Sequence, residues 1–186
     1  MRRRKMNILI VIDMQKDFVD GALGTPEAVE IVPAAAEKIL AYAHRGDVII
    51  ATRDTHGENY LDTQEGRNLP VVHCVRDTPG WQLDETIAAV LPKGTIMVDK
   101  PTFGSTELAE IVGRYVEEYG QENVNVELIG LCTDICVVSN ALLLKAHYYE
   151  MPMSVDPRCC AGVTPEKHAA ALETMASCQI RILGQA

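Results

Sequence analysis

A cysteine stands where an apolar run gives way to a helical segment, in Gly130-Leu131-Cys132-Thr133-Asp134-Ile135-Cys136. The run ends at Gly130, and a helix is expected to begin at Thr133 or Asp134. A thiol in the first turn of a helix lies near the positive end of the helix dipole and near free backbone N–H groups, which stabilise both a thiolate and an oxyanion. Cys136 is therefore a candidate nucleophile, although a cysteine at this position also serves as a small buried residue.

Two ionisable residues follow other apolar runs and could activate this thiol. Asp13 comes directly after Ile12, and Lys100 comes directly after Asp99. A carboxylate beside a thiol could accept its proton, and an ammonium could stabilise the thiolate by its charge. Alternatively, Asp13 caps a helix and Lys100 is solvated. Taken together, the three residues favour nucleophilic catalysis, with Asp13, Lys100 and Cys136 as the candidate catalytic residues.

A second set of residues has the composition of a metal site. Asp54 and His56 are separated by one residue, and side chains two positions apart in an extended segment point the same way. They could share one metal ion, and His73 from a neighbouring strand could complete a three-ligand site, with Glu65 as a further candidate. Two histidines, a carboxylate and open positions filled by water describe a catalytic site. His73 could equally be a hydrogen-bonded histidine of the core.

A fold must bring these candidate residues together, and the hydrophobic pattern indicates which one. Short apolar runs alternate with segments of helical periodicity along almost the whole chain. Strands are expected at residues 7–13, 47–52, 71–75, 95–99 and 123–130, and more weakly at 153–155 and 179–183. Helices are expected at residues 25–44, 82–91, 105–119, 134–149 and 165–177. The alternation predicts an α/β fold, a three-layer α/β/α sandwich whose mainly parallel sheet is covered by helices on both faces.

In such a sheet, ligands bind at the carboxyl ends of the strands. All the candidate residues lie at or near the expected strand ends, apart from Glu65. Glu65 lies in the segment 53–70, the longest stretch without periodicity, and loops of this kind in compact domains are usually functional.

Size and charge exclude several classes of protein. The 186 residues match the usual size of one domain, so residues 1–186 are expected to form a single domain. With 17 Lys and Arg against 26 Asp and Glu, the formal net charge is −9, which argues against nucleic acid and anionic membranes as the main partners. The basic run at residues 2–5 is interpreted as a solvated end. No apolar stretch is long enough to span a bilayer and no cleavage site follows the first run, so a cytoplasmic protein is expected.

The chain has six cysteines but is too long and too apolar to need disulfides. The pair Cys159-Cys160 and the spacing of Cys132 and Cys136 raise the alternative of a thiol redox or metal-storage protein. Adjacent cysteines in a strand point to opposite faces, and this spacing differs from the CxxC of redox helices. Buried structural thiols are therefore the favoured interpretation.

Four segments together resemble a known family over essentially the whole chain. They are Asp13-Met14-Gln15-Lys16-Asp17-Phe18, Thr52-Arg53-Asp54-Thr55-His56, Lys100-Pro101-Thr102-Phe103-Gly104-Ser105-Thr106 and Gly130-Leu131-Cys132-Thr133-Asp134-Ile135-Cys136-Val137. In this order they resemble the isochorismatase-like cysteine hydrolases, most closely the nicotinamidases.

The resemblance implies a six-stranded parallel sheet and a catalytic triad at Asp13, Lys100 and Cys136. It implies a cis peptide bond at Leu131-Cys132 and an oxyanion hole formed by the backbone amides of Cys132 and Cys136. It also implies one divalent metal ion, with zinc expected and iron or manganese as alternatives. The ligands would be Asp54, His56 and His73, with Glu65 as the additional glutamate that some members have.

Phe18 corresponds to the aromatic residue that packs on the pyridine ring, and Phe103 resembles a second wall of the pocket. Several nicotinamidases place a tryptophan three residues before the last metal histidine, where this chain has Pro70. Its single tryptophan, Trp81, comes after that histidine.

The expected activity is hydrolysis of nicotinamide to nicotinate and ammonia through a Cys136 thioester, a reaction of NAD salvage. Alternatives are another carboxamide, an N-carbamoyl or ureido substrate, an isochorismatase acting on a vinyl ether, or a catalytically silent binding protein. The expected partners are a small-molecule carboxamide and further copies of this chain in a homo-oligomer.

Overall fold

The computed structural model describes residues 5–184. Its strands form a six-stranded sheet in the order β3-β2-β1-β4-β5-β6, in which all neighbouring pairs are parallel. The strands are β1 (Met6–Ile12), β2 (Val48–Asp54), β3 (Ile96–Lys100), β4 (Val124–Leu131), β5 (Met153–Ala161) and β6 (Arg181–Ile182). The strand order starts in the middle and runs outwards both ways, as in a doubly wound sheet.

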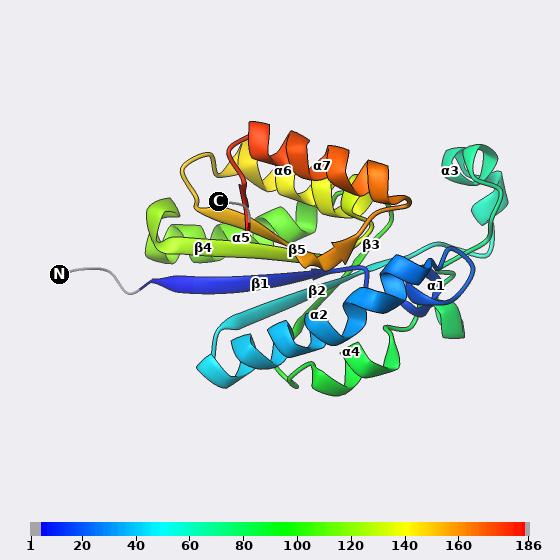
Figure 1. The fold of residues 1–186 in the computed structure, drawn as a ribbon, viewed down its shortest axis with the longest axis horizontal. Helices are drawn as coiled ribbons and strands as arrows, with labels where there is room; N and C mark the ends of the chain where they lie inside the picture. Colours follow the sequence, from blue (N-terminus) through cyan, green and yellow to red (C-terminus); the bar gives the residue numbers. More distant parts are fainter. Residues whose placement is uncertain (1–4, 185–186) are drawn as a thin grey trace.

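Helices cover both faces of this sheet (Figure 1). They are α1 (Lys16–Val19), α2 (Pro26–Arg45), α3 (Gln64–Asn68), α4 (Glu85–Val90), α5 (Thr106–Tyr119), α6 (Val138–His147) and α7 (Pro165–Ser177). Helices α2 and α4 lie on one face, and α5, α6 and α7 lie on the other. The predicted three-layer α/β/α sandwich is confirmed. The short helices α1 and α3 lie beyond the carboxyl ends of the strands.

Local sequence signals set the ends of the longer helices. The Thr25 hydroxyl accepts a hydrogen bond from the N–H of Ala28 at the start of α2, and Gly46 ends that helix with a φ of 71°. Ser105 and Thr164 cap α5 and α7 in the same way. These are the expected N-cap residues and the expected left-handed glycine at a helix end.

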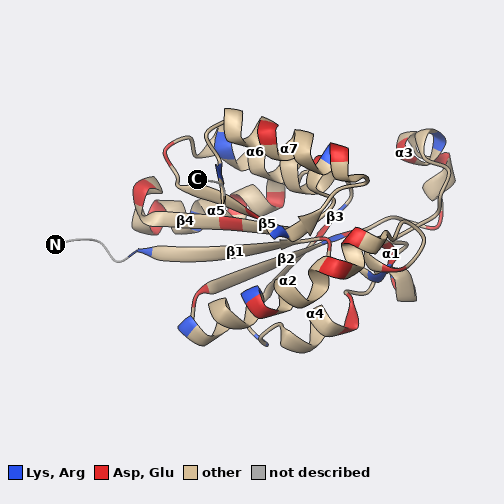
Figure 2. Cartoon of the chain, in the orientation of Figure 1, with Lys and Arg blue, Asp and Glu red and all other residues tan. Residues whose placement is uncertain are grey.

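Acidic side chains outnumber basic ones in the sequence, and in the view of Figure 2 the two kinds are interspersed over the helices. Among the described residues, no helix combines the length and the apolar character that a membrane span requires. The basic run at residues 2–5 lies outside the described residues apart from Lys5.

The prediction of a strand at residues 71–75 is wrong. The segment makes a single isolated bridge, between His56 and Val75, instead of joining the sheet. The edge of β2 that it would have joined is taken by β3, with Asp54 opposite Lys100. Cys74 also has a φ of 45°, which extended strands do not adopt.

Other elements differ in length from the predictions. The segment at 153–155 is the start of β5, which continues to Ala161 through a bulge between the pairs Leu128↔Val155 and Gly130↔Cys160. The helix predicted at 82–91 begins only after its N-cap, Asp84. The helix predicted at 134–149 starts as a π-helical turn, Thr133–Val137, and continues as α6. The strand predicted at 179–183 is reduced to β6.

Strands β1 and β4 approach closely at their carboxyl ends because Gly130 has no side chain. Gly130 pairs with Ile12 and has a φ of 122°. A Cβ atom at this position would lie 2.0 Å from the carbonyl oxygen of Ile12. Glycine is therefore required where the β4 backbone passes the end of β1.

A buried ionic network joins α2 to the sheet beneath it. The Lys38 ammonium lies 2.8 Å from Asp156 and 2.5 Å from Glu127, and the Tyr42 hydroxyl donates to Glu127 at 2.7 Å. Arg158, an exposed residue, pairs with Asp156 at 2.8 Å. Burial alone would raise the pKa of Asp156, but the hydrogen bonds from Arg158 and Lys38 outweigh it and lower the pKa from 3.8 to about 2.

This lowered pKa predicts a loss of stability in acid. Because the folded protein holds Asp156 ionised more strongly than the unfolded chain does, its contribution is complete above about pH 4 and is lost as the pH falls through about 2. The unfolding free energy of the parent chain should fall over this pH range, and we expect the fall to be about 1 to 2 kcal/mol smaller in Asp156→Asn. The lower value allows for the exposure of Arg158, because solvent weakens its attraction to Asp156. Urea titrations at several pH values measure the difference, with Asp20→Asn as the exposed control. An unchanged pH dependence in Asp156→Asn would contradict the prediction.

Candidate active site

Strand register brings the three predicted catalytic residues to one point. Asp13 follows the last residue of β1, which pairs with Gly130 on β4. On the other side of β1, Lys100 is the last residue of β3. Cys136 lies in the π-helical turn that follows β4. Three strand ends therefore supply one residue each to the same edge of the sheet.

The side chains of these residues are in contact. Lys100 Nζ lies 2.6 Å from Asp13 Oδ2 and donates to Cys136 Sγ at 3.4 Å and to the carbonyl of Thr102 at 3.1 Å. The Thr52 hydroxyl donates to Asp13 Oδ1 at 2.6 Å. Asp13 and Lys100 are fully buried, and the side chain of Cys136 is nearly so.

Burial and the two neighbouring charges shift the pKa of the sulfur in opposite directions. Burial raises the pKa of the Cys136 thiol well above 9, and the negative charge of Asp13 raises it further, while Lys100 lowers it. Burial also raises the pKa of Asp13 above 3.8, against the opposing effect of Lys100. A thiol beside a carboxylate of raised proton affinity is arranged for proton transfer from sulfur to oxygen.

The predicted metal ligands also converge. One ligand atom from each of four residues lies within 4.8 Å of the others, and the residues are Asp54, His56, Glu65 and His73. Asp54 Oδ2 is 2.9 Å from His56 Nε2 and 3.6 Å from His73 Nε2. Two imidazoles and two carboxylates suit a divalent ion such as zinc, iron or manganese. The set fits a divalent metal site.

Neighbouring groups orient the ligands of this set. His73 Nδ1 donates to the carbonyl of Val71 at 2.7 Å, which leaves Nε2 facing Asp54. Burial alone would raise the pKa of Asp54, but the adjacent imidazoles of His56 and His73 hold it well below 3.8. Burial alone would lower the pKa of His73, but the nearby carboxylate of Asp54 raises it above 6.5.

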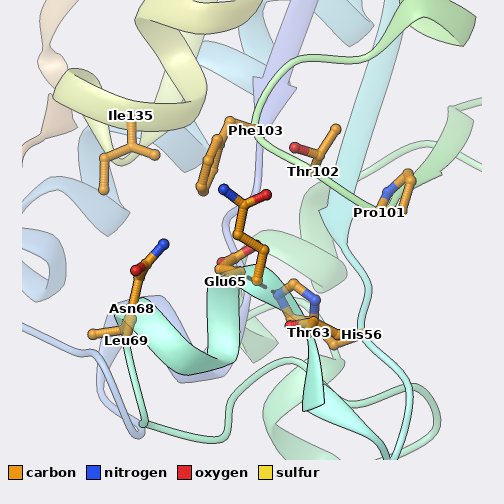
Figure 3. Close-up of a pocket in the computed structure, with 10 residues that line it drawn as sticks. His56, Thr63, Glu65, Asn68, Leu69, Pro101, Thr102, Phe103 and Ile135 are labelled. Atoms are coloured by element: carbon orange, nitrogen blue, oxygen red, sulfur yellow. Dashed lines mark ion pairs between the residues drawn. The ribbon is translucent and has the colours of Figure 1, made fainter. Parts of the chain in front are cut away.

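Two adjoining cavities open onto these residues. An inner cavity of about 270 Å³ is lined by Cys136, Cys132, Phe18 and Phe103 as well as by three of the metal-site residues. An outer cavity of about 610 Å³ shares four lining residues with it, which are Glu65, Leu69, Phe103 and Ile135. Figure 3 shows the outer cavity between the α3 segment, which carries Glu65 and Asn68, and the loop Pro101–Phe103.

The aromatic residues have different surroundings. The ring centroid of Phe18 is 5.5 Å from that of His73, so Phe18 packs beside the candidate metal ligands. Phe103 is half-exposed between the two cavities. Trp81 is buried away from both cavities, where its Nε1 donates to the Thr55 hydroxyl and the guanidinium of Arg53 lies over its ring.

The turn before Cys136 has the backbone geometry that the resemblance implies, because the peptide bond Leu131-Cys132 is cis. The carbonyl of Cys132 accepts from the N–H groups of Ile135 and Val137, both at 3.1 Å, which closes the π-helical turn around Cys136.

Several residues at the site are missing from the predicted set. The Tyr60 ring is fully buried against His56 and His73, at centroid distances of 4.7 and 5.0 Å, and its hydroxyl donates to the carbonyl of Leu69. Tyr60 lies in the segment without periodicity, where no pattern marks a buried residue. Thr52 belongs to a quoted motif, but only the fold shows that its hydroxyl reaches Asp13.

An α/β/α sandwich that carries a buried cysteine, lysine and aspartate at the strand ends defines a class of hydrolases. The isochorismatase domain family matches residues 7–186, and the chain belongs to the isochorismatase family. The nicotinamidase of Escherichia coli is 29% identical over 91% of this chain and 90% of its own length. The nicotinamidase/pyrazinamidase of Mycobacterium tuberculosis is 28% identical over 96% of this chain and 98% of its own length.

A solved structure is also similar, that of the pyrazinamidase of Pyrococcus horikoshii in complex with zinc. It is 33% identical with a TM-score of 0.77, and the match covers 95% of this chain and 98% of that chain. The predictions of an isochorismatase-like fold and of a hydrolase acting on amide C–N bonds are confirmed.

The contacts predict how the thiol responds to loss of the neighbouring carboxylate. Asp13→Asn removes a negative charge that raises the pKa of Cys136 and leaves Lys100 in place, so the pKa of Cys136 falls. At pH 8 we expect Cys136 to react with iodoacetamide about three- to fourfold faster for each unit of lowered pKa, because the thiolate fraction rises while the nucleophilicity of the thiolate falls. Mass spectrometry of the Cys136 peptide measures the rate, with exposed Cys178 as the internal reference and Asp20→Asn as the control. Slower alkylation in Asp13→Asn would contradict the arrangement.

Proposed function

We propose that this protein is a nicotinamidase, which hydrolyses nicotinamide to nicotinate and ammonia and serves NAD salvage. The observation that carries the proposal is the shared inner cavity, onto which both Cys136 and the metal-site residues Asp54, Glu65 and His73 open. A planar ring with a carboxamide on one side and a ring nitrogen on the other could place the carboxamide beside Cys136 and the nitrogen beside the metal site. The names of the similar proteins support the same substrate class.

The first half of the reaction uses the contacts around the sulfur. Asp13 takes the thiol proton of Cys136 as the sulfur attacks the carboxamide carbon, and Lys100 stabilises the negative charge on sulfur. We assign the oxyanion to the backbone amides of Cys132, the N-cap of the π-helical turn, and of Cys136 within that turn. Each such donor contributes about 3 kcal/mol in comparable sites. Asp13 then gives its proton to the departing amine, which leaves as ammonia.

The second half returns the enzyme to its starting state. Asp13 takes a proton from water, whose oxygen attacks the thioester carbon. The C–S bond breaks and the proton on Asp13 returns to the sulfur of Cys136, while the product leaves as nicotinic acid and ionises to nicotinate in water. Because burial raises the pKa of Asp13, the carboxyl group can both accept and release this proton.

We assign Asp54, His56, Glu65 and His73 as the metal ligands and zinc as the metal, in line with the zinc complex of the similar pyrazinamidase. When bound, a divalent ion supplies a Lewis acid that orients the pyridine nitrogen, directly or through water. We assign Phe18 as the aromatic residue that packs on the ring, because it lies beside His73 in the inner cavity. We assign Phe103, which lines the same cavity, as a second wall of the pocket.

The outer cavity favours a second candidate, an amidase for carboxamides with a substituent beyond the ring. Its volume of about 610 Å³ lies within the range of pockets that hold drug-sized ligands. Its walls outside the metal site carry neutral polar side chains, among them Thr63, Gln64 and Asn68. N-carbamoyl and ureido compounds belong to the same candidate class.

Ammonia release from nicotinamide tests the nucleophile and the substrate together. We expect Cys136→Ala to reduce kcat by at least about 1000-fold, because the group that forms the covalent intermediate is lost. Cys178→Ala, which changes an exposed thiol, should retain full activity. Near-normal turnover in Cys136→Ala would overturn the nucleophile assignment. Turnover of larger carboxamides or ureido compounds without turnover of nicotinamide would select the second candidate.

Metal removal tests the role of the ligand cluster. We expect elemental analysis to find about one divalent ion per chain and chelation to raise KM for nicotinamide by at least about tenfold, with a smaller effect on kcat. His73→Ala should lose the ion, and His147→Ala, which changes an exposed histidine, should retain it. A chelated enzyme with unchanged KM would contradict the role in orienting the ring.

A further inference from the structure

Two buried carboxamide side chains, those of Gln15 and Asn140, each join two backbone segments at the site. Both residues are fully buried, and neither belongs to the assigned catalytic or metal-binding groups. Each uses its oxygen as an acceptor and its nitrogen as a donor of two hydrogen bonds. The inference below rests on the proposed roles of Cys136 and of the metal cluster.

Gln15 holds the backbone of the metal-site residue Asp54 from both sides. Its Oε1 accepts from the N–H of Asp54 at 2.7 Å, and its Nε2 donates to the carbonyl of Asp54 at 2.8 Å. The same Nε2 donates to the carbonyl of Trp81 at 2.8 Å. The position of Asp54 at the end of β2 is thereby tied to the loop that follows β1.

The sheet explains why a side chain is needed there. The pairing of β1 with β2 ends at Val11, which lies opposite Ala51. The pairing of β2 with β3 continues further, to Asp54 opposite Lys100. The Asp54 backbone thus lies beyond the β1 ladder. The Gln15 carboxamide supplies the donor and the acceptor that a longer β1 strand would have supplied.

Asn140 performs the corresponding task on the nucleophile side. Its Nδ2 donates to the carbonyl of Cys136 at 2.8 Å and to the carbonyl of Phe103 at 3.0 Å. Its Oδ1 accepts from the N–H of Ser105 at 2.9 Å. Asn140 therefore fixes the Cys136 turn against the loop that carries Phe103.

We propose that Gln15 and Asn140 are positioning residues with separate tasks: Gln15 sets the metal site through Asp54, and Asn140 sets the reactivity of Cys136. Among the described residues, the hydrogen bonds of the Gln15 side chain reach only Asp54 and Trp81, and those of Asn140 reach only Cys136, Phe103 and Ser105. The two halves of the site are thus held by different buried carboxamides.

The test compares two apolar replacements of similar shape, Gln15→Met and Asn140→Leu, in the full chain. Zinc affinity is measured by competition with a chromogenic chelator, and the reactivity of Cys136 is measured by iodoacetamide alkylation with Cys178 as the internal reference. We expect Gln15→Met to weaken zinc binding by about 10- to 100-fold with an unchanged alkylation rate. We expect Asn140→Leu to bind zinc like the parent chain. The same variant should change the alkylation rate of Cys136 and should lower kcat, each by up to about 100-fold.

A general loss of stability would move both measurements in both variants, and that result would overturn the proposal. Parent-like zinc affinity in Gln15→Met, or parent-like alkylation and kcat in Asn140→Leu, would also overturn it. If either replacement fails to fold, Gln15→Asn and Asn140→Ser keep a polar group with a shorter reach, and the same pattern of effects is expected at smaller size. Neither zinc affinity nor alkylation requires the substrate to be nicotinamide, so failure of the proposed function is distinguishable from failure of this inference.

Discussion

The ion pair between Asp13 and Lys100 is the interaction on which the site depends. Both groups are fully buried, and a buried charge is strongly unfavourable unless a partner and further hydrogen bonds compensate for the lost water. Here Thr52 donates to the carboxylate, and Lys100 donates to the carbonyl of Thr102 and to the sulfur of Cys136. The ion pair is therefore both a buried structural contact of the sheet and a part of the proposed catalytic site.

The same ammonium group links the sulfur to the metal cluster. Lys100 Nζ is 3.8 Å from Asp54 Oδ1, while Asp54 Oδ2 faces the two histidines. Because Asp54 pairs with Lys100 in the register of β2 and β3, a shift of either strand by one residue would separate these groups and turn their side chains to the opposite face. Sheet register therefore determines the charge balance of the whole site.

Much of this arrangement could be predicted from the sequence, because apolar runs mark buried strands and the reactive residues follow them. The prediction failed at 71–75, where the composition suits a strand but the edge of β2 is already taken by β3 and the Asp17 carboxylate accepts from the N–H of Cys74. Glu65 could be proposed but not placed, because it lies on the five-residue helix α3 within a segment that has no periodicity. Contacts between side chains and distant backbone, such as those of Gln15 with Asp54 and of Asn140 with Ser105, leave no periodic signal at all.

The absence of a side chain at Gly130 has a consequence for how this protein tolerates genetic variation. The backbone of β4 can pass beside Ile12 only with a glycine there, and the turn that carries Cys136 follows within a few residues. A missense change at Gly130 would displace the thiol from its carboxylate while leaving every ionisable residue intact. Inherited loss of activity in this chain can thus arise at a position outside the groups proposed for proton transfer, metal binding and substrate contact.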